Sequence, residues 1–580
     1  MFASIARISI MLLLGWLTLP ASASQPSAPL QDNPACTALT TTDLSAVAGV
    51  GSHVLSTASQ SLNGARYCVV QSRLMPAITV TTLLPEEGWT GRYMQIGCGG
   101  LCGMIGMNVG AAAGCAPLTQ NGVAMAATDM GHSMQEVDFG KDPQKRRDFA
   151  DRAQHLAAVA SKALIRQFYG KPARWSYFNG CSDGGREALI AAQRYPDDFN
   201  GIIAGAAAMN FLAQNALYHA WQARTNTGSD GRAILTADLL PVLHQSVVAQ
   251  CDGLDGQKDG LIAEPQACHP DLQSIRCPAG EAGKNCLTDL QIKTVQRLYD
   301  GPRDQQSGER MTVGGPLPGS ELAWIGVFVP RMADQPLMSA QASLAVLRYL
   351  AFEQTKPDFK LSDLTFDRAT FDKLRALHPL YDATNPDLSA FAKAGGKLII
   401  WHGLADPHIS PLNSIAYHQA VGKQMGEAQR DSFERLYLLP GVYHCSGGEG
   451  PSLVDFMTPL MNWVEQGRAP DTVVSWQAPK DDHNGFGQPG GMQGKSGKPA
   501  GKAHGKLPPP DAMSDHPLAL RIDSVPHGSA GRPVYPYPYR AAYRSGDPAQ
   551  PANYQRVKVS EVPTRYPWLG EEFFTPYSAL

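Results

Sequence analysis

The stretch that most constrains the fold of this chain is a glycine-rich turn at residues 179–186, Asn-Gly-Cys-Ser-Asp-Gly-Gly-Arg. A short β-type run, residues 174–178, precedes this turn, and a helical pattern follows it. Gly180, Ser182 and Gly184 therefore match G-x-S-x-G at a strand-to-helix junction, a turn so tight that the serine hydroxyl projects clear of the sheet. Because the motif also occurs by chance in glycine-rich chains, it needs support from the rest of the sequence.

A second glycine-rich loop lies upstream of the serine. Residues 91–96 have the pattern of a buried strand, and residues 97–103 read Gly-Cys-Gly-Gly-Leu-Cys-Gly. Glycine suits a loop whose backbone N–H must approach a substrate oxygen with no side chain in the way. We predict an oxyanion hole formed by the amide of Gly99 or Gly100 and the amide of Asp183. The alternatives are a flexible loop or a phosphate cradle, although the spacing of known phosphate loops is missing.

An aspartate and a histidine follow two later strand-like runs. One run ends just before Asp406 and the other just before His444. The order Ser182, Asp406, His444 is that of a catalytic triad in an α/β-hydrolase, so we predict this fold, with a mostly parallel sheet flanked by helices. Asp129 and His132 precede the serine, which is the wrong order, and we interpret them as structural. Taken singly, Asp406 could be a turn residue and His444 a packed loop residue.

The strand–helix alternation fades between the serine and Asp406. This segment has its own cysteines and several Pro/Gly breaks, and it reads as an inserted lid above the sheet. A Gly/Pro/Lys-rich stretch near the C-terminus reads as a disordered insertion, with a basic binding segment as the alternative. The predicted parts are a signal peptide at 1–23, a catalytic domain at 24–208 and 385–580 with the disordered insertion at 485–510, and a lid at 209–384.

The N-terminus and the overall charge limit location and partners. Arg7, an apolar run over residues 8–19 and a small-residue site ending near Ala23 predict a cleaved signal peptide. The apolar run is short for a membrane anchor, which is the alternative. The net charge is -3, with 49 Lys plus Arg against 52 Asp plus Glu. This balance gives no indication of nucleic acid or a membrane as partner, and we expect a secreted or periplasmic protein.

Export makes the eleven cysteines informative, because an oxidising compartment favours pairing and an odd count leaves one thiol over. Cys181 adjoins Ser182, and Cys445 adjoins His444. If the serine and the histidine lie within hydrogen-bond reach, these two cysteines are close enough to form a disulfide. The alternative is two unrelated buried thiols. A zinc site is disfavoured, because the sequence has no C-x-x-C pair.

Several of these motifs together resemble the tannase and feruloyl esterase family. They are G-C-S-x-G-G-R at 180–186, H-G-x-x-D-P at 402–407, the His-Cys pair at 444–445 and the G-C-G-G-L-C-G loop. The similarity spans roughly residues 36–554. Many members carry a cysteine in a late R-P-x-C-P-Y-P motif, where this chain has Tyr535.

The resemblance implies an activity and the roles of several residues. Family members are serine esterases that act on esters of aromatic carboxylic acids, such as gallate, ferulate, chlorogenate or a terephthalate monoester. It implies that Ser182, Asp406 and His444 form the triad and that Cys181–Cys445 is a supporting disulfide. The rivals are a lipase, carboxylesterase or peptidase of the same fold, and a calcium-stabilised binding protein with a vestigial triad. The sequence does not predict the oligomeric state.

A loop of the predicted lid has the composition of a calcium site. In residues 251–261, three carboxylates alternate with glycines, which suits Ca²⁺ but does not match an EF-hand. A solvated acidic turn is the alternative. The family resemblance supports a structural calcium, with Cys251–Cys268 and Cys277–Cys286 as disulfides nearby. The implied ligands are the side chains of Asp252, Asp255 and Asp259 and the carbonyls of Gln257 and Leu261.

The remaining predictions concern other disulfides and the substrate pocket. We predict Cys36–Cys68 and Cys102–Cys115, with Cys98 as the free thiol. His402 is a candidate for lining the pocket, although a packed strand-end histidine is as good an interpretation. Candidates in the lid for contacts to an aromatic ring or a carboxylate are Trp324, Phe328 and Arg331.

Overall fold

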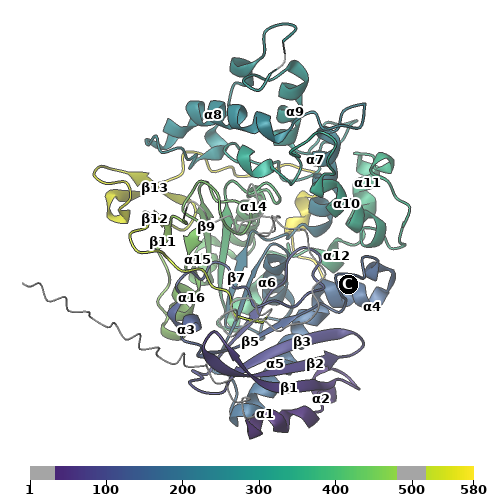
Figure 1. The fold of residues 1–580 in the computed structure, drawn as a ribbon, viewed down its shortest axis with the longest axis vertical. Helices are drawn as coiled ribbons and strands as arrows, with labels where there is room; N and C mark the ends of the chain where they lie inside the picture. The colour runs from purple at the N-terminus through teal and green to yellow at the C-terminus, as the bar shows by residue number, and fades with distance from the viewer. Residues whose placement is uncertain (1–32, 282, 480–517, 580) are drawn as a thin grey trace, which may run out of the picture.

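The structure is a computed structural model that describes residues 33–281, 283–479 and 518–579, and a nine-stranded sheet lies at its centre (Figure 1). Six strands, β5, β4, β6, β7, β8 and β9 in spatial order, are parallel to their neighbours. The strands β1, β2 and β3 pair antiparallel and extend the sheet beyond β5. In spatial order the strands are β1 (His53–Leu62), β2 (Ala65–Leu74), β3 (Ile78–Pro85), β5 (Val123–Thr128), β4 (Arg92–Ile96), β6 (Trp175–Cys181), β7 (Gly201–Gly205), β8 (Lys397–Gly403) and β9 (Glu434–Leu439). This arrangement confirms the predicted α/β-hydrolase core.

The parallel strands are buried on both faces, which explains their nearly continuous apolar sequences. Successive side chains point to opposite faces of the sheet. Phe178, Ile202 and Ile400 belong to one hydrophobic cluster, together with residues of α5, α6 and α14. Tyr177 and Ile203 belong to a second cluster on the other face, together with residues of α16. The sheet is therefore the middle layer of three.

Helices surround the sheet, and seven of them lie in the described chain between β7 and β8. Their bounds are α1 (Pro34–Ala38), α2 (Ser45–Ala48), α3 (Ala116–Thr119), α4 (Pro143–Arg147), α5 (Ala153–Tyr169), α6 (Asp183–Arg194), α7 (His219–Thr225), α8 (Leu240–Cys251), α9 (Asp289–Asp300), α10 (Met338–Tyr349), α11 (Arg368–Arg375), α12 (His378–Tyr381), α13 (Ser389–Lys393), α14 (Leu412–Met425), α15 (Glu427–Phe433) and α16 (Met457–Gln466). None of the helices in the described part of the chain is both long enough and apolar enough to span a bilayer.

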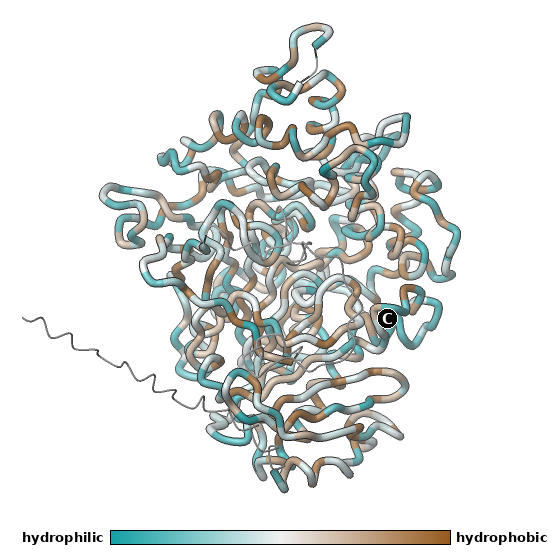
Figure 2. Tube along the Cα trace, viewed as in Figure 1, coloured by the Kyte–Doolittle hydropathy of each residue, from teal (hydrophilic) through white to brown (hydrophobic). Residues whose placement is uncertain are grey.

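The segment between β7 and β8 contributes no strand to the central sheet within the described residues. It has a hydrophobic cluster of its own that includes residues of α8 and α9. In Figure 1, α8 and α9 lie at the top of the molecule, away from the strands of the core. Figure 2 shows hydrophilic stretches on many of the outer loops and hydrophobic ones within the core and the upper helices. The assignment of residues 209–384 as a lid domain stays an interpretation.

The C-terminal residues return to the core. They form two small antiparallel sheets, β10-β11-β12 and β13-β14, and a backbone bridge joins Tyr437 in β9 to Pro536. The strands are β10 (Leu453–Val454), β11 (Val473–Trp476), β12 (Gly531–Val534), β13 (Tyr539–Tyr543) and β14 (Tyr554–Lys558). The predicted signal peptide, 1–23, and the predicted disordered insertion, 485–510, lie outside the described residues.

Candidate active site

Ser182 occupies a strained turn between β6 and α6, with φ 64° and ψ −119°. The surrounding glycines are required by close backbone packing. A Cβ on Gly180 would lie 2.2 Å from the carbonyl oxygen of Gly184, and a Cβ on Gly184 would lie 2.8 Å from that of Cys98. Ser182 is half-buried, whereas the first two turns of α6 behind it are buried. The sequence motif therefore folds into the sharp elbow that presents a serine at the end of a strand.

Asp406 and His444 lie on the loops that follow β8 and β9. Nδ1 of His444 is 2.7 Å from Oδ2 of Asp406. The other carboxylate oxygen accepts hydrogen bonds from the backbone N–H groups of His408, at 2.8 Å, and Ile409, at 3.0 Å. Asp406 is fully buried. Since an ionised carboxylate only accepts, His444 donates through Nδ1, and in this tautomer Nε2 carries the lone pair of the ring.

The charge of Asp406 is stabilised despite its burial. Burial alone would raise the pKa of this carboxyl, but the attraction and hydrogen bonds of His444 and His402 outweigh it and hold the pKa well below its ordinary value. His402 lies near the end of β8, fully buried, with Nδ1 2.8 Å from Oγ of Ser414 and Nε2 3.2 Å from Oδ2 of Asp406. The expectation that His402 lines a pocket is therefore wrong, because its side chain packs inside the core and supports Asp406.

A disulfide joins the serine elbow to the histidine loop. Cys181 and Cys445 are bonded across a sequence separation of 264, with their Cα atoms 6.0 Å apart. The bond links the residue before Ser182 to the residue after His444. It confirms the predicted pairing and holds both loops at the same edge of the sheet.

The glycine-rich loop after β4 lies directly against the elbow. The N–H of Gly184 donates to the carbonyl of Cys98 at 2.7 Å. Gly99 and Gly100 are exposed. Within the described residues, neither their amides nor that of Asp183, the first residue of α6, donates a hydrogen bond. Free amides beside the serine, one of them at a helix N-terminus, are a suitable arrangement for an anionic oxygen. The assignment of these amides to an oxyanion hole stays a prediction.

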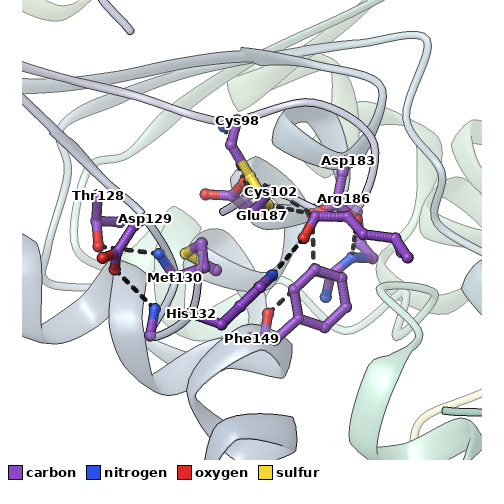
Figure 3. The surroundings of a disulfide bond; sticks show 12 residues. Cys98, Cys102, Thr128, Asp129, Met130, His132, Phe149, Asp183, Arg186 and Glu187 are labelled. Atoms are coloured by element: carbon purple, nitrogen blue, oxygen red, sulfur yellow. Dashed lines mark hydrogen bonds and ion pairs between the residues drawn. A yellow bond between two sulfur atoms is a disulfide. The ribbon is translucent and has the colours of Figure 1, made fainter. Parts of the chain in front are cut away.

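Asp129 and His132 have structural contacts, in agreement with their interpretation from the sequence. One carboxylate oxygen of Asp129 accepts from the amides of Thr79 and Gly131, both at 2.9 Å. Nε2 of His132 is 2.7 Å from the carbonyl of Leu101. These side chains fix the turn after β5 and the neighbouring glycine-rich loop (Figure 3).

The predicted aromatic contacts from the lid are wrong. Trp324 and Phe328 are fully buried in the hydrophobic cluster of the inserted segment, where they pack against each other with ring centroids 5.2 Å apart. The indole N–H of Trp324 donates to Oγ of Ser320. These rings form part of the interior of the inserted segment, because a segment of this size needs a core of its own. Arg331 is exposed, and its predicted role stays a prediction.

Two histidines beside the predicted triad were not singled out from the sequence. The ring centroid of His408 lies 4.9 Å from that of His444 and 5.9 Å from that of His219 in α7. Burial lowers the pKa of His408 well below its ordinary value and that of His219 to about 4, so both are neutral at neutral pH. His408 could have been singled out from the sequence, because it follows Asp406 by two residues. His219 is far away in the sequence and offers no such signal.

The disulfides agree with the sequence except in one region. Cys36–Cys68, Cys251–Cys268 and Cys277–Cys286 are bonded as predicted. The predicted Cys102–Cys115 bond is wrong, since Cys102 pairs with Cys98 and Cys115 is the free, buried thiol.

Local backbone geometry explains the different pairing. Gly100 and Cys102 both have positive φ, 62° and 61°, and the tight turn brings the Cα atoms of Cys98 and Cys102 to 5.4 Å. Cys115 instead immediately precedes α3 and lies in the second hydrophobic cluster, where burial raises its pKa to about 11.

Two of the predicted calcium ligands lie beside an arginine. Asp255 and Asp259 approach the guanidinium of Arg532 in β12 at 3.1 and 2.8 Å. Burial raises the pKa of Asp259, and so do the charges of Asp255 and Asp252, although Arg532 opposes them. Among the described residues, the buried Oε1 of Gln257 has no partner. The third carboxylate, Asp252, accepts hydrogen bonds from the amides of Asp259 and Gly260. These oxygen atoms are donors of the type that Ca²⁺ prefers, but the three carboxylates are not among the groups of described residues whose ligand atoms lie within 4.8 Å of one another.

Comparison with known proteins agrees with this geometry. Residues 63–557 match the family model described as tannase and feruloyl esterase. A probable feruloyl esterase B-1 of Aspergillus terreus is 33% identical over 447 residues, which cover 72% of this chain and 79% of the relative. A mono(2-hydroxyethyl) terephthalate hydrolase of Piscinibacter sakaiensis is 30% identical over 458 residues, covering 68% and 74%.

Solved structures show the same fold. The crystal structure of feruloyl esterase B from Aspergillus oryzae superposes with a TM-score of 0.72 at 24% identity, covering 90% of this chain and all of that one. The match to the family model extends over most of the chain, including the elbow and the loops that follow β8 and β9. The chain therefore belongs to the tannase and feruloyl esterase family of carboxylic ester hydrolases.

Proposed function

We propose that this protein is a secreted serine esterase that hydrolyses esters of aromatic carboxylic acids, of the feruloyl or galloyl type. The observation that carries the proposal is the buried Asp406–His444 hydrogen bond, tied to the Ser182 elbow by the Cys181–Cys445 disulfide. The names of the relatives support the aromatic acyl group. The N-terminal signal pattern and five disulfides support export.

Each residue has a defined task in this proposal. His444 takes the proton of Ser182 as its oxygen attacks the ester carbonyl. Asp406 holds His444 in the tautomer that leaves Nε2 as the base, and it stabilises the imidazolium that forms. The amides of Asp183 and of Gly99 or Gly100 stabilise the oxyanion. His444 then protonates the leaving alcohol and activates the water that releases the acid.

Calcium has a structural part in this proposal. Asp252, Asp255 and Asp259, with the carbonyls of Gln257 and Leu261, would hold the ion at the base of the inserted segment. When bound, Ca²⁺ supplies only charge neutralisation and loop rigidity. The proposed hydrolysis needs no metal, because the triad and the backbone amides account for every proton and charge.

Initial rates on a small panel of esters test the proposal. The wild type is expected to hydrolyse methyl ferulate or methyl gallate, and Ser182→Ala should lose this activity while keeping its circular dichroism spectrum. Mono(2-hydroxyethyl) terephthalate, a triglyceride and a peptide complete the panel. Preference for the triglyceride or the peptide would overturn the aromatic acyl specificity, and activity in Ser182→Ala would overturn the serine mechanism.

A further inference from the structure

A compact polar cluster lies directly behind the predicted oxyanion loop (Figure 3). It contains Cys98, Cys102, Asp183 and Glu187, and one ligand atom from each lies within 4.8 Å of the others. These residue types could surround a metal ion. In this structure, however, the two sulfur atoms are bonded to each other, and Arg186 holds Asp183 by hydrogen bonds of 2.7 and 3.0 Å. A different role must account for the cluster.

Glu187 is the second carboxylate of the cluster, beside Asp183. Its side chain is buried, 1% exposed, in the second turn of α6. Burial and then the neighbouring charge of Asp183 raise its pKa to about 8. Its Oε1 accepts a hydrogen bond from the backbone N–H of Cys98 at 3.0 Å and lies 2.9 Å from Sγ of the same residue. A buried carboxyl thus supports the residue that immediately precedes Gly99.

The predicted oxyanion loop is held by hydrogen bonds at both ends, and its middle is exposed to solvent. On one side, Cys98 accepts from Gly184 and donates to Glu187, as described above. On the other side, the carbonyl of Leu101 faces His132. Gly99 and Gly100 between them are exposed, and a Cβ on either would meet open space. The Cys98–Cys102 bond therefore closes a short ring around the two glycines, and one backbone hydrogen bond, from the N–H of Cys102 to the carbonyl of Gly99 at 3.0 Å, lies within this ring.

We propose that Glu187 and the Cys98–Cys102 disulfide are positioning residues for the oxyanion loop, and that this disulfide is a thiol-exchange site whose reduction loosens the loop. The proposal rests on the proposed function, since it assigns Gly99 or Gly100 to the oxyanion hole. The disulfide limits the backbone freedom of the two glycines, and Glu187 fixes the start of the ring against α6. Preorganised donors of this kind contribute most of the benefit of an oxyanion hole.

The exchange step takes a small dithiol as reductant. Its thiolate attacks Sγ of Cys98, a half-buried residue whereas Cys102 is buried, and forms a mixed disulfide while the Cys98–Cys102 bond breaks. Cys102 leaves with the electron pair and takes the proton of Glu187, whose Oε1 is 3.9 Å away. The second thiolate of the reductant then displaces Cys98, which is protonated by water, as is Glu187. The dithiol becomes a disulfide, and the protein gains two thiols.

Reduction of the intact protein provides the first test. Samples treated with dithiothreitol are alkylated with iodoacetamide, mapped by mass spectrometry and assayed in parallel. We expect Cys98 and Cys102 to be alkylated before the other pairs, with kcat falling about tenfold in step, KM unchanged, and recovery on reoxidation. The double variant Cys98→Ser/Cys102→Ser should have the reduced kcat from the start and show no further loss under the same conditions. Earlier opening of another pair, or wild-type kcat in the double variant, would refute the proposal.

Variants of Glu187 provide the second test. Glu187→Leu removes the acceptor for the amide of Cys98 and should lower kcat about tenfold without changing KM. Glu187→Gln keeps an acceptor oxygen and should restore most of that loss, which a purely structural destabilisation would not explain. Cys277→Ser/Cys286→Ser is the matched control for removing a disulfide of short separation, and its kcat should be unchanged. Equal kcat in Glu187→Leu and the wild type would overturn the positioning role.

A fluorophosphonate probe separates this proposal from the proposed function. The probe modifies an activated serine whatever ester the enzyme prefers, and its reaction also needs the oxyanion hole. Labelling of Ser182 without hydrolysis of any aromatic ester would refute the substrate class alone. Labelling at the same rate before and after opening of the Cys98–Cys102 bond would refute the inference alone.

Discussion

Removal of the Cys181–Cys445 disulfide should cost both stability and activity. In the chain-entropy model, a cross-link over a separation of 264 stabilises the folded state by about 5.5 kcal/mol. The disulfides Cys251–Cys268 and Cys277–Cys286 lie inside this loop, but their separations of 17 and 9 shorten it too little to matter, because the dependence is logarithmic.

The control is a second disulfide far from the elbow. Cys277–Cys286, with a separation of 9, should contribute about 2.5 kcal/mol in the same model. Urea unfolding of Cys181→Ser/Cys445→Ser and of Cys277→Ser/Cys286→Ser, followed by tryptophan fluorescence, measures the two losses. We expect the first loss to be about twice the second. Only the first variant should also lose kcat, since only that bond holds the His444 loop against Ser182.

Two results would refute this reasoning. Equal losses of stability in the two variants would mean that the length of the closed loop does not set the contribution. Unchanged kcat in Cys181→Ser/Cys445→Ser would mean that the hydrogen bond between Asp406 and His444 and the packing of the two loops position the histidine without the covalent bond.

Four further predictions concern single sites. Asp406→Asn should lower kcat by about 10⁴ while the fold is kept, because His444 then loses its acceptor; a loss below tenfold on an aromatic ester would contradict the triad. Gly184→Ala should lower the urea midpoint by an amount equivalent to about 1–3 kcal/mol, since its Cβ would lie 2.8 Å from a backbone oxygen, and an unchanged midpoint would show that the loop moves freely. Calcium at 100 times its Kd should stabilise the wild type by about 2.7 kcal/mol in thermal unfolding but have no effect on Asp252→Asn, and an equal response would place the ion elsewhere. The pKa of Glu187 rises from 4.5 to about 8 on folding, so its contribution to stability is complete below pH 4.5 and is lost as pH rises to about 8. The thermal midpoint of Glu187→Gln should lack this part of the decline, and identical pH profiles would exclude it.

The sequence predicted the features that depend on local geometry. The elbow has a strand, two close-packed glycines and a helix in consecutive residues, so G-x-S-x-G could be located from pattern alone. Asp406 and His444 each follow a run of buried residues, and their order along the chain limits the fold further. The adjacency of Cys181 to Ser182 and of Cys445 to His444 turned one expected contact into a predicted disulfide.

The errors concern features that depend on packing between distant segments. Trp324 and Phe328 were expected in a pocket because they are aromatic and lie in the predicted lid, but the inserted segment has a hydrophobic cluster of its own, and they form part of it. The Cys98–Cys102 bond depends on positive φ angles in a loop of glycines, which composition permits but does not specify. The contact of Arg532 with Asp255 and Asp259 joins residues more than 270 positions apart, as the separation of 273 from Asp259 shows.

The disulfide pattern has a consequence for how the chain is oxidised. If each cysteine paired with the next one along the chain, Cys36–Cys68, Cys98–Cys102, Cys251–Cys268 and Cys277–Cys286 would form correctly. Cys115, however, would pair with Cys181, and Cys445 would emerge last without a partner. Pairing in this order would therefore form the other four disulfides but not Cys181–Cys445, which lies beside Ser182. In that case, formation of Cys181–Cys445 requires either that Cys115 is already buried or that an isomerase corrects the error, so correct pairing beside Ser182 depends on the earlier folding of the segment around α3.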